Sequence, residues 1–215
     1  MKQRSEASLI GVVIYDGVEP IDVGGTVGVM SMATRILPAL RYVVIAERIG
    51  PVRLASGLTV LADTDFSNAP TCDKYIVTGG PGWREQIRNP AMLDFLSHRS
   101  SSELASVCTG ALILAASGRL AGKSATTRRN AVGSEADAPI DHLAANGRLL
   151  ATPAAAIVDD GGTVTSGGVS LAIDGTLYVL GLIYGNETRD AVASLIEYDR
   201  AYAANREGLG HILVR

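Results

Sequence analysis

The sequence predicts an α/β fold with a mostly parallel central sheet that is covered by helices. Short apolar segments alternate along the chain with longer segments of helical character, which is typical of βαβ units. The 24 glycines and the low aromatic content of 5% indicate tight turns between strands and helices rather than a helical bundle. A hydrophobic content of 47% supports a sizeable core. We expect one domain over residues 1–215, with its core at about residues 9–203.

The predicted strands are short runs rich in apolar and β-branched residues. Residues 9–15 form a continuous apolar run, which indicates a strand that is buried on both faces. Residues 58–61 indicate a strand outside the main sheet. The other predicted strands are residues 41–46, 74–78, 104–107, 123–127 and 164–166.

The predicted helices lie between or after these strands. Residues 21–34 form a helix that is rich in small residues at its start. Pro90 occupies a first-turn position of the helix at 89–99, where its missing N–H costs nothing. The other predicted helices are residues 109–120, 170–184 and 187–203.

Composition and charge exclude several classes of protein. The net charge is −3 and no basic stripe is present, so nucleic-acid binding has no electrostatic support. Met1–Ser8 is polar, and Asp174 interrupts the longest apolar stretch, residues 168–184, before it could span a bilayer. Cys72 and Cys108 form neither a disulfide framework nor a zinc-binding spacing. We therefore expect a cytoplasmic protein that binds no membrane, nucleic acid or metal.

Cys108 lies at the corner between the strand at 104–107 and the helix at 109–120. A nucleophile at such a sharp turn needs small residues two positions away on either side, and Ser106 and Gly110 meet this need. The corner also places the sulfur at a helix N-terminus, where the helix dipole and free N–H groups favour a thiolate. The alternative is a buried structural cysteine, a common fate of free cysteines.

Three glycine-containing segments follow predicted strands, at residues 79–82, 106–110 and 166–168. Ligands of such sheets bind outside the carboxyl ends of the strands. Gly17 and the acidic residues after it follow the first strand, so they can reach the same rim. We expect the functional site there.

Four separated segments resemble the ThiJ/PfpI superfamily, and they occur in the order typical of that family over roughly residues 9–200. They are I-G-V-V-I-Y-D-G-V-E-P-I-D-V-G-G, K-Y-I-V-T-G-G-P-G, S-V-C-T-G-A-L-I-L-A-A-S-G-R-L-A-G-K-S-A-T-T and G-T-V-T-S-G-G-V-S-L-A-I-D. The resemblance implies a flavodoxin-like three-layer sandwich, a cysteine-based site without cofactor, and a homodimer.

Within the superfamily the chain most resembles the isocyanide hydratase branch. That branch has C-T-G at the cysteine, an acid in the form L-D after the first strand, and a late S/T-G-G-x-x-x-x-I-D segment. The corresponding residues here are 108–110, Ile21-Asp22 and 166–174. Similar segments occur in amidase-like sensor domains of some transcription regulators.

The resemblance assigns a role to each matching position. Cys108 corresponds to the nucleophile, Asp22 to the active-site acid and Thr109 to the residue that follows the nucleophile. Gly79 and Gly80 correspond to a loop whose N–H groups face the sulfur. The N–H of Thr109 and one from Gly79 or Gly80 could stabilise charge that develops on a substrate.

Physical chemistry supports these roles and leaves alternatives. A nucleophilic thiol needs a low pKa, and a carboxyl beside a thiolate should then retain its proton. Asp22 could instead cap a helix that begins near Val23. Asp16 is predicted to be a turn residue and Glu19 to be solvated, although both are rivals for the acid. The hydroxyl of Thr109 could orient a water molecule or cap the helix.

The chain departs from the family pattern at two places. Peptidase-like members often have His after the cysteine, whereas this chain has Thr109, and His98, His142 and His211 have no supporting motif. In the hydratase branch, His and Trp commonly follow the two threonines that are here followed by Arg128 and Arg129.

These departures affect the charge of the predicted pocket and therefore the substrate that it favours. If Arg128 and Arg129 line it, the pocket favours an anionic or polar substrate; otherwise they are solvated arginines. Trp83 could form a wall of the pocket or part of a partner surface. Asp174, in an apolar helix, is expected to be a buried hydrogen-bond anchor.

The resemblance therefore implies a cysteine-dependent lyase, similar to isocyanide hydratase, that adds water to an isocyanide to give an N-substituted formamide through a cysteine thioimidate. One alternative is a non-catalytic thiol sensor or small-molecule-binding protein on the same fold. Another is a different activity of the superfamily, such as glyoxalase or amidase chemistry. The missing Cys–His pair argues against amide hydrolysis.

Overall fold

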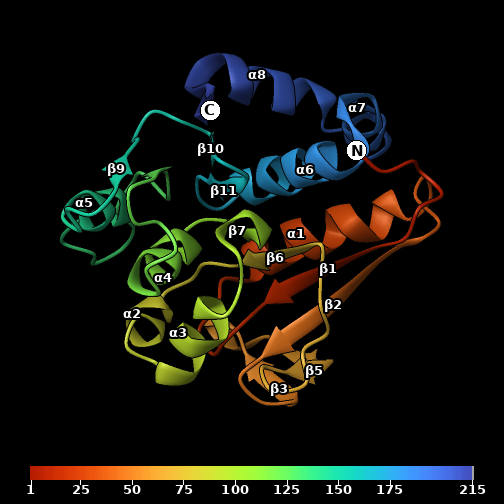
Figure 1. The fold of residues 1–215 in the computed structure, drawn as a ribbon. Coiled ribbons are helices and arrows are strands. Elements are labelled where there is room, and N and C mark those ends of the chain that lie inside the picture. Colours follow the sequence, from red (N-terminus) through yellow and green to blue (C-terminus); the bar gives the residue numbers. More distant parts are fainter. Residues whose placement is uncertain (215) are drawn as a thin grey trace.

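The computed structural model describes residues 1–214, which form an eight-stranded sheet with helices on both faces (Figure 1). The strands of this sheet are β1 (Ser8–Val13), β2 (Leu40–Ala46), β5 (Thr64–Asp65), β6 (Lys74–Val77), β7 (Leu104–Ser106), β10 (Ile157–Asp160), β11 (Thr163–Ser166) and β12 (His211–Val214). Their order is β12-β10-β11-β7-β6-β1-β2-β5, and all neighbours are parallel except β10 and β11. The predicted α/β class and mostly parallel sheet are confirmed.

The helices form two groups on opposite faces of the sheet (Figure 1). On one face, α1 (Pro20–Ala33), α6 (Leu171–Tyr184) and α7 (Asn186–Leu195) pack against one another, and α8 (Asp199–Leu209) packs on α7. On the other face, α4 (Gly110–Ala116) contacts β6 and β7 and is flanked by α2 (Trp83–Gln86), α3 (Pro90–Ser97) and α5 (Pro139–Ala144).

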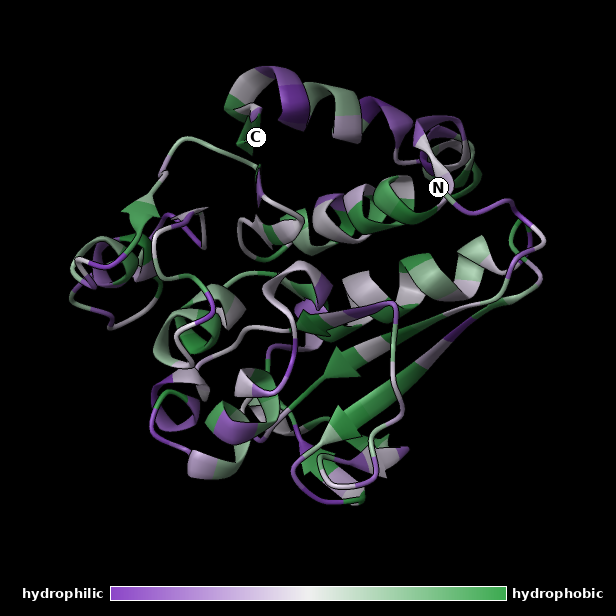
Figure 2. Cartoon of the chain, viewed as in Figure 1, coloured by the Kyte–Doolittle hydropathy of each residue, from purple (hydrophilic) through white to green (hydrophobic). Residues whose placement is uncertain are grey.

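The hydrophobic core lies between these layers. The strands β1 and β2 are mostly hydrophobic, whereas α8 on the outside carries many hydrophilic residues (Figure 2). Ile10, Ile45, Ile76 and Ile113 are among the large side chains that are completely buried. Within residues 1–214, every helix is too short or too polar to cross a bilayer. The single-domain organisation of residues 1–215 stays a prediction.

The sheet topology brings the carboxyl ends of three strands together. β1 pairs with β2 on one side and with β6 on the other, so the chain reverses its winding direction at β1. β6 in turn pairs with β7. Such a reversal opens a crevice at the carboxyl ends of the strands. The loops that follow β1, β6 and β7 meet at this crevice.

Two small sheets and one broken helix differ from the simple pattern. β4 (Thr59–Ala62) lies outside the main sheet, as predicted, and pairs with β3 (Gly50–Arg53), while β8 (Ser124–Ala125) pairs with β9 (Leu150–Ala151). The single helix predicted at 187–203 is wrong. It is divided into α7 and α8, and Glu197 between them adopts a left-handed conformation with φ of 55°.

Gly110 allows the start of α4 to approach the sheet very closely. A Cβ atom at this position would lie 2.1 Å from the backbone oxygen of Val77 at the end of β6. We expect Gly110→Ala to lower the free energy of unfolding by about 3 kcal/mol or more, because backbone atoms must move apart. Gly208→Ala in α8 is the control, since nothing lies within 4 Å of its added Cβ. Equal denaturation midpoints for Gly110→Ala and the wild type would contradict this packing.

Candidate active site

The chain turns sharply at Cys108, which directly follows the end of β7. Cys108 has a φ of 53°, a left-handed conformation that is strained for a residue other than glycine. Hydrogen bonds hold the turn on both sides of the residue. Its N–H donates to the oxygen of Gly167 at 3.1 Å, and its C=O accepts from Thr127 Oγ1 at 2.6 Å. The side chain is buried, with the residue only 3% exposed.

Two backbone N–H groups are directed at the sulfur of Cys108. They belong to Thr109 and Val169, and both favour the thiolate by lowering the pKa of the thiol. Val169 has a φ of 62°, which is a clear outlier for a β-branched residue. The sequence places the glycines before Val169 in a loop at the rim, but residue type gives no signal for the direction of this N–H.

Asp22 lies in the first turn of α1 and is completely buried. Its Oδ2 accepts a hydrogen bond from the N–H of Gly79 at 3.1 Å. Its Oδ1 has no nitrogen or oxygen partner among residues 1–214. The alternative role as a helix cap is wrong, because α1 begins at Pro20 and Glu19 occupies the N-cap position. Proline at the first helical position explains this earlier start.

Asp22 and Cys108 lie close enough for each side chain to shift the pKa of the other. Burial raises the pKa of the Asp22 carboxyl to about 7, an effect that its interactions with Cys108 and Gly79 oppose. Burial and then the charge of Asp22 raise the pKa of the Cys108 thiol to about 12. The predicted low thiol pKa is therefore wrong, because burial outweighs the two N–H groups. The pair is expected to hold at most one negative charge, with a proton available for transfer between them.

Gly79 lies where the three predicted site residues converge. A Cβ atom on Gly79 would be 2.5 Å from Thr109 N, 2.7 Å from Cys108 Cβ and 2.8 Å from Asp22 Oδ2. At Gly80, which has a φ of 151°, a Cβ atom would lie 2.3 Å from the backbone nitrogen of Glu19, in the loop between β1 and α1. Both positions therefore require glycine for space, and Gly80 also for its backbone conformation.

The N–H groups of these two glycines already have partners. The N–H of Gly79 is used by Asp22, and the N–H of Gly80 donates to Thr109 Oγ1 at 2.8 Å. The hydroxyl of Thr109 also lies 3.3 Å from the oxygen of Gly80 and makes no capping bond to α4. Both glycines therefore position site side chains, and the N–H groups at the sulfur come from Thr109 and Val169 instead.

Tyr15 is a buried neighbour of the site that sequence analysis missed. Its hydroxyl donates to the oxygen of Thr78 at 3.1 Å and interacts with Thr109. Burial, together with the charges of Cys108 and Asp22, raises its pKa well above the ordinary value. Tyr15 therefore stays neutral and can act as a hydrogen-bond donor. The only sequence signal was its place at the end of an apolar run.

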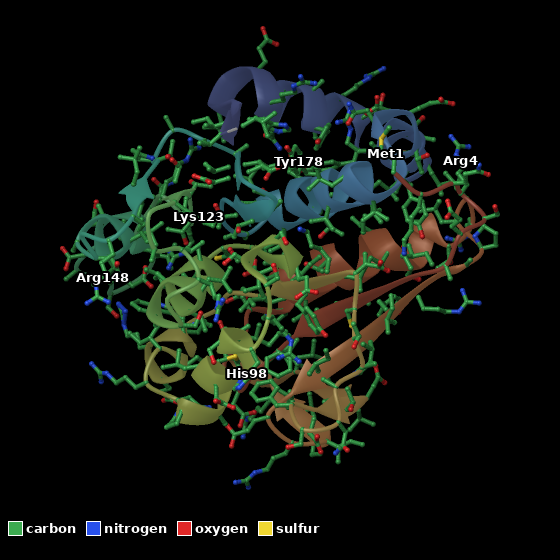
Figure 3. All side chains as sticks on the ribbon, viewed as in Figure 1. Met1, Arg4, His98, Lys123, Arg148 and Tyr178 are labelled. Atoms are coloured by element: carbon green, nitrogen blue, oxygen red, sulfur yellow. The ribbon has the colours of Figure 1, made fainter. Side chains whose placement is uncertain are left out.

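The histidines and Trp83 lie outside the Cys108–Asp22 pair. His98 lies on the surface beside Asp94, and it is labelled in Figure 3 near α3. His142 packs against the buried Trp83 ring with centroids 5.4 Å apart, and His211 packs against tyrosines near β12. Among residues 1–214, no hydrogen bond joins a histidine to Cys108.

Of the other acidic candidates, Asp16 and Asp174 have structural partners. Asp16 Oδ1 accepts the N–H of Arg53 at 2.8 Å, and Glu19 is partly exposed at the start of α1. Asp174 is completely buried and accepts hydrogen bonds from Tyr198 at 2.9 Å and from Asn205 at 3.1 Å. Asp174 is therefore the buried anchor that the sequence predicts, and it ties α6 to α8.

Arg128 reaches the site, whereas Arg129 is exposed. The charge of Arg128 lowers the pKa of Asp22, and its side chain lies over Gly168 so closely that a Cβ there would be 2.5 Å from Arg128 Cβ. The guanidinium is held by Glu135 at 2.7 and 2.8 Å. Both arginines line one cavity that shares Thr127 and Val169 with the Cys108 turn, and Arg129 is at the same time exposed to solvent.

A model of the DJ-1/PfpI family matches residues 9–180, which is most of the chain. The chain belongs to the DJ-1/PfpI family. The resemblance drawn from the four motifs is therefore confirmed, and the motifs that contain Asp22, Gly79, Cys108 and Val169 all lie inside the matched segment.

Two curated proteins illustrate the range of this family. The chain is 29% identical over 195 residues to isonitrile hydratase of Pseudomonas putida, covering 88% of this chain and 78% of that protein. It is 24% identical over 201 residues to the HTH-type transcriptional regulator GbdR of Pseudomonas aeruginosa, covering 92% of this chain but only 53% of the regulator. The DJ-1/PfpI relatives thus include an enzyme and a regulator.

Solved structures of DJ-1/PfpI relatives have the same fold. A ThiJ/PfpI family protein from Pseudomonas syringae matches with a TM-score of 0.77 at 24% identity, covering 91% of this chain and 76% of that chain. DJ-1beta of Drosophila melanogaster matches with a TM-score of 0.75 at 19% identity, covering 89% of this chain and 98% of that chain. The flavodoxin-like architecture is therefore shared.

Proposed function

We propose that this protein hydrates isocyanides to N-substituted formamides, with Cys108 as nucleophile and Asp22 as proton shuttle. The observation that carries the proposal is the buried contact between these two side chains, in which burial raises the pKa of Asp22 to about 7. A group with a pKa near neutrality accepts and returns protons efficiently. The similarity to isonitrile hydratase of Pseudomonas putida supports this choice of reaction.

In the first half of the reaction, Asp22 accepts the thiol proton as the sulfur attacks the terminal carbon of R–N≡C. Asp22 then passes this proton to the same carbon, which gives the covalent thioimidate R–N=CH–S–Cys108. The N–H groups of Thr109 and Val169 stabilise negative charge on the sulfur during the transfer. The neutral resting thiol therefore becomes a nucleophile only while its proton is on Asp22.

In the second half, water adds to the thioimidate carbon and one of its protons goes to the nitrogen. The C–S bond breaks, R–NH–CHO leaves, and the remaining proton returns to the sulfur through Asp22. Covalent capture divides one difficult addition into two easier steps. Both steps need only the thiol, the carboxyl and water, so the mechanism has no role for a metal or an organic cofactor.

The direct test is incubation of the purified protein with an alkyl isocyanide, with the formamide product followed by proton NMR. We expect catalytic turnover at neutral pH. Product at the rate of a protein-free control would refute isocyanide hydration.

The thiol-sensor alternative has less support from the site. Oxidation by peroxide follows thiolate character and exposure, whereas Cys108 is buried and its thiol pKa is raised. We therefore expect Cys108 to stay mainly reduced when peroxide is added in slight excess, as measured by intact mass spectrometry. Rapid and selective formation of a sulfenic or sulfinic acid on Cys108 would instead favour the sensor.

Amide hydrolysis, the other alternative, also has less support, because it lacks a histidine partner for the thiol.

Quaternary structure and location complete the proposal. We propose a cytoplasmic homodimer, as expected from the resemblance of the sequence to its family. For a chain of 22.4 kDa, light scattering should give about twice this mass at micromolar concentration. A mass that remains at the monomer value would contradict the dimer.

A further inference from the structure

A cavity of about 240 Å³ borders the Cys108 turn. It is lined by the segment after β8, by the loop between β11 and α6, and by the C-terminal half of α8. Two of its lining residues contact the nucleophile directly, because Thr127 bonds the Cys108 oxygen at 2.6 Å and the Val169 N–H is directed at the sulfur. A group that occupies the cavity therefore contacts the same residues that hold the Cys108 turn.

The lining of this cavity is positively charged. Arg128 and Arg129 both line it, and the lining residues described in the structure include no aspartate or glutamate. Glu135 binds the guanidinium of Arg128 and balances its charge at 2.7 and 2.8 Å. Arg129 has no ion-pair partner within residues 1–214. Its charge is therefore available to a ligand.

The size of the cavity limits what it can hold. Pockets for drug-sized ligands measure roughly 300–1,000 Å³, so a cavity of about 240 Å³ suits a substituent of a few carbon atoms. The segment that provides Arg129 contributes no aromatic side chain, and Leu171 and Leu209 also line the cavity. A short aliphatic group that ends in an anion matches both the volume and the charge.

We propose that this cavity binds the substituent of the substrate and that the protein prefers isocyanides that carry a carboxylate, which Arg129 binds. This inference rests on the proposed hydration reaction for the identity of the reacting group. Arg128 has a different task. Fixed over Gly168 by Glu135, it positions the wall of the cavity and leaves the adjacent arginine to meet the anion.

The first test compares isocyanoacetate with its methyl ester, which has the same skeleton without the charge. At low ionic strength we expect kcat/KM for the acid to exceed that for the ester by about tenfold, as for one partly exposed ion pair of about 1.4 kcal/mol. The preference should shrink several-fold in about 0.5 M salt because an exposed charge is screened. Equal kcat/KM values for the two compounds would overturn the inference.

Matched variants assign the preference to one residue. Arg129→Gln should bring the ratio of acid to ester close to one, and Arg129→Lys should retain most of it. Arg148→Gln makes the same change of charge outside the cavity, near α5 and β9 (Figure 3), and should leave the ratio unchanged. An identical loss in Arg129→Gln and Arg148→Gln would mean that only the overall charge matters, which would overturn the role of Arg129.

A second test does not depend on isocyanide chemistry. In alkylation by iodoacetate or iodoacetamide, the Cys108 sulfur displaces iodide, forms an S–C bond and loses its proton to solvent. Relative to free cysteine, we expect the ratio of the iodoacetate rate to the iodoacetamide rate at Cys108 to be several-fold higher, and Arg129→Gln should abolish this increase. Peptide mass spectrometry distinguishes Cys108 from Cys72.

The two tests fail in different ways. A raised alkylation ratio without hydration of either isocyanide would refute the proposed function and keep the anion-binding cavity. Hydration of both isocyanides with an ordinary alkylation ratio would refute the cavity and keep the function. If neither reagent alkylates Cys108, whose raised thiol pKa slows the reaction, the isocyanide comparison decides, and an acid-to-ester ratio that Arg129→Gln leaves unchanged would overturn the inference.

Discussion

Cys108→Ser is expected to lower the rate of isocyanide hydration by more than about 10³-fold while the protein stays folded. Serine has nearly the same size as cysteine and can occupy the strained turn that the structure shows at this position. Its hydroxyl is a much weaker nucleophile, and a carboxyl with a pKa near 7 cannot deprotonate it effectively. The measurement is formamide production by NMR, together with circular dichroism to establish folding.

Cys72→Ala provides the matched control for this experiment. Cys72 is also buried, but its sulfur lies against the oxygen of Pro70 at 3.4 Å and belongs to the core rather than to the crevice. We expect this variant to lose some stability and to keep its hydration rate. Equal hydration by Cys108→Ser and the wild type would eliminate the covalent mechanism.

Asp22→Asn is expected to have two opposite effects. Hydration should fall by about 10²–10⁴-fold, the usual contribution of a positioned acid–base group. Stability should rise at pH 8, because the wild-type carboxyl is then ionised in a completely buried position. The variant keeps an oxygen that can accept the N–H of Gly79, so the loop remains anchored.

The sign of the pH dependence follows from the direction of the pKa shift. Burial raises the pKa of Asp22 from an ordinary value of 3.8 to about 7, so the folded protein binds more protons than the unfolded chain between these values. Asp22 therefore makes wild-type stability fall as the pH rises from about 4 to 7, by on the order of a few kcal/mol. The Tm gain of Asp22→Asn should be small at pH 4 and largest above pH 7.

Thermal unfolding of both proteins at a series of pH values would measure this difference. Asp174→Asn is the comparison, since Asp174 is another buried carboxyl but binds Tyr198 and Asn205 away from the sulfur. It should change stability without the large loss of kcat expected for Asp22→Asn. A Tm difference between Asp22→Asn and the wild type that does not vary with pH would contradict a buried, titrating Asp22.

The sequence predicts the convergence of Asp22, Gly79 and Cys108 well, because each follows a parallel strand and such strands end at one edge of a sheet. It also indicates the sharp turn at Cys108, because the small residues that such a turn requires are adjacent in sequence. Reasoning from local apolar runs does not predict the strands β10 and β12. β10 ends in two acidic residues, and the pairing of β12 with it joins segments about 54 residues apart in sequence, as in the pair Ile157 and His211. Neither strand has enough apolar alternation to be distinguished locally.

The errors at the site concern quantities that depend on three-dimensional burial. A helix N-terminus suggests a low thiol pKa, but the extent of desolvation at Cys108 is set by residues distant in sequence. The N–H of Val169 and the hydroxyl of Tyr15 contribute through direction and packing, which residue type does not reveal. The departure at Arg128 and Arg129 could be noticed in the sequence, but only the structure shows that Glu135 binds the first of them.

The left-handed backbones of Cys108 and Val169 have a consequence for protein engineering. Each such conformation costs roughly 1–3 kcal/mol in a residue other than glycine, and here the two are joined through one N–H and one sulfur. The substitution Val169→Gly would remove the backbone strain at this position and raise the thermal stability of the protein, but it would leave the loop more flexible. Directed evolution that selects for thermal stability alone should therefore enrich such variants first, although their catalytic activity is lower.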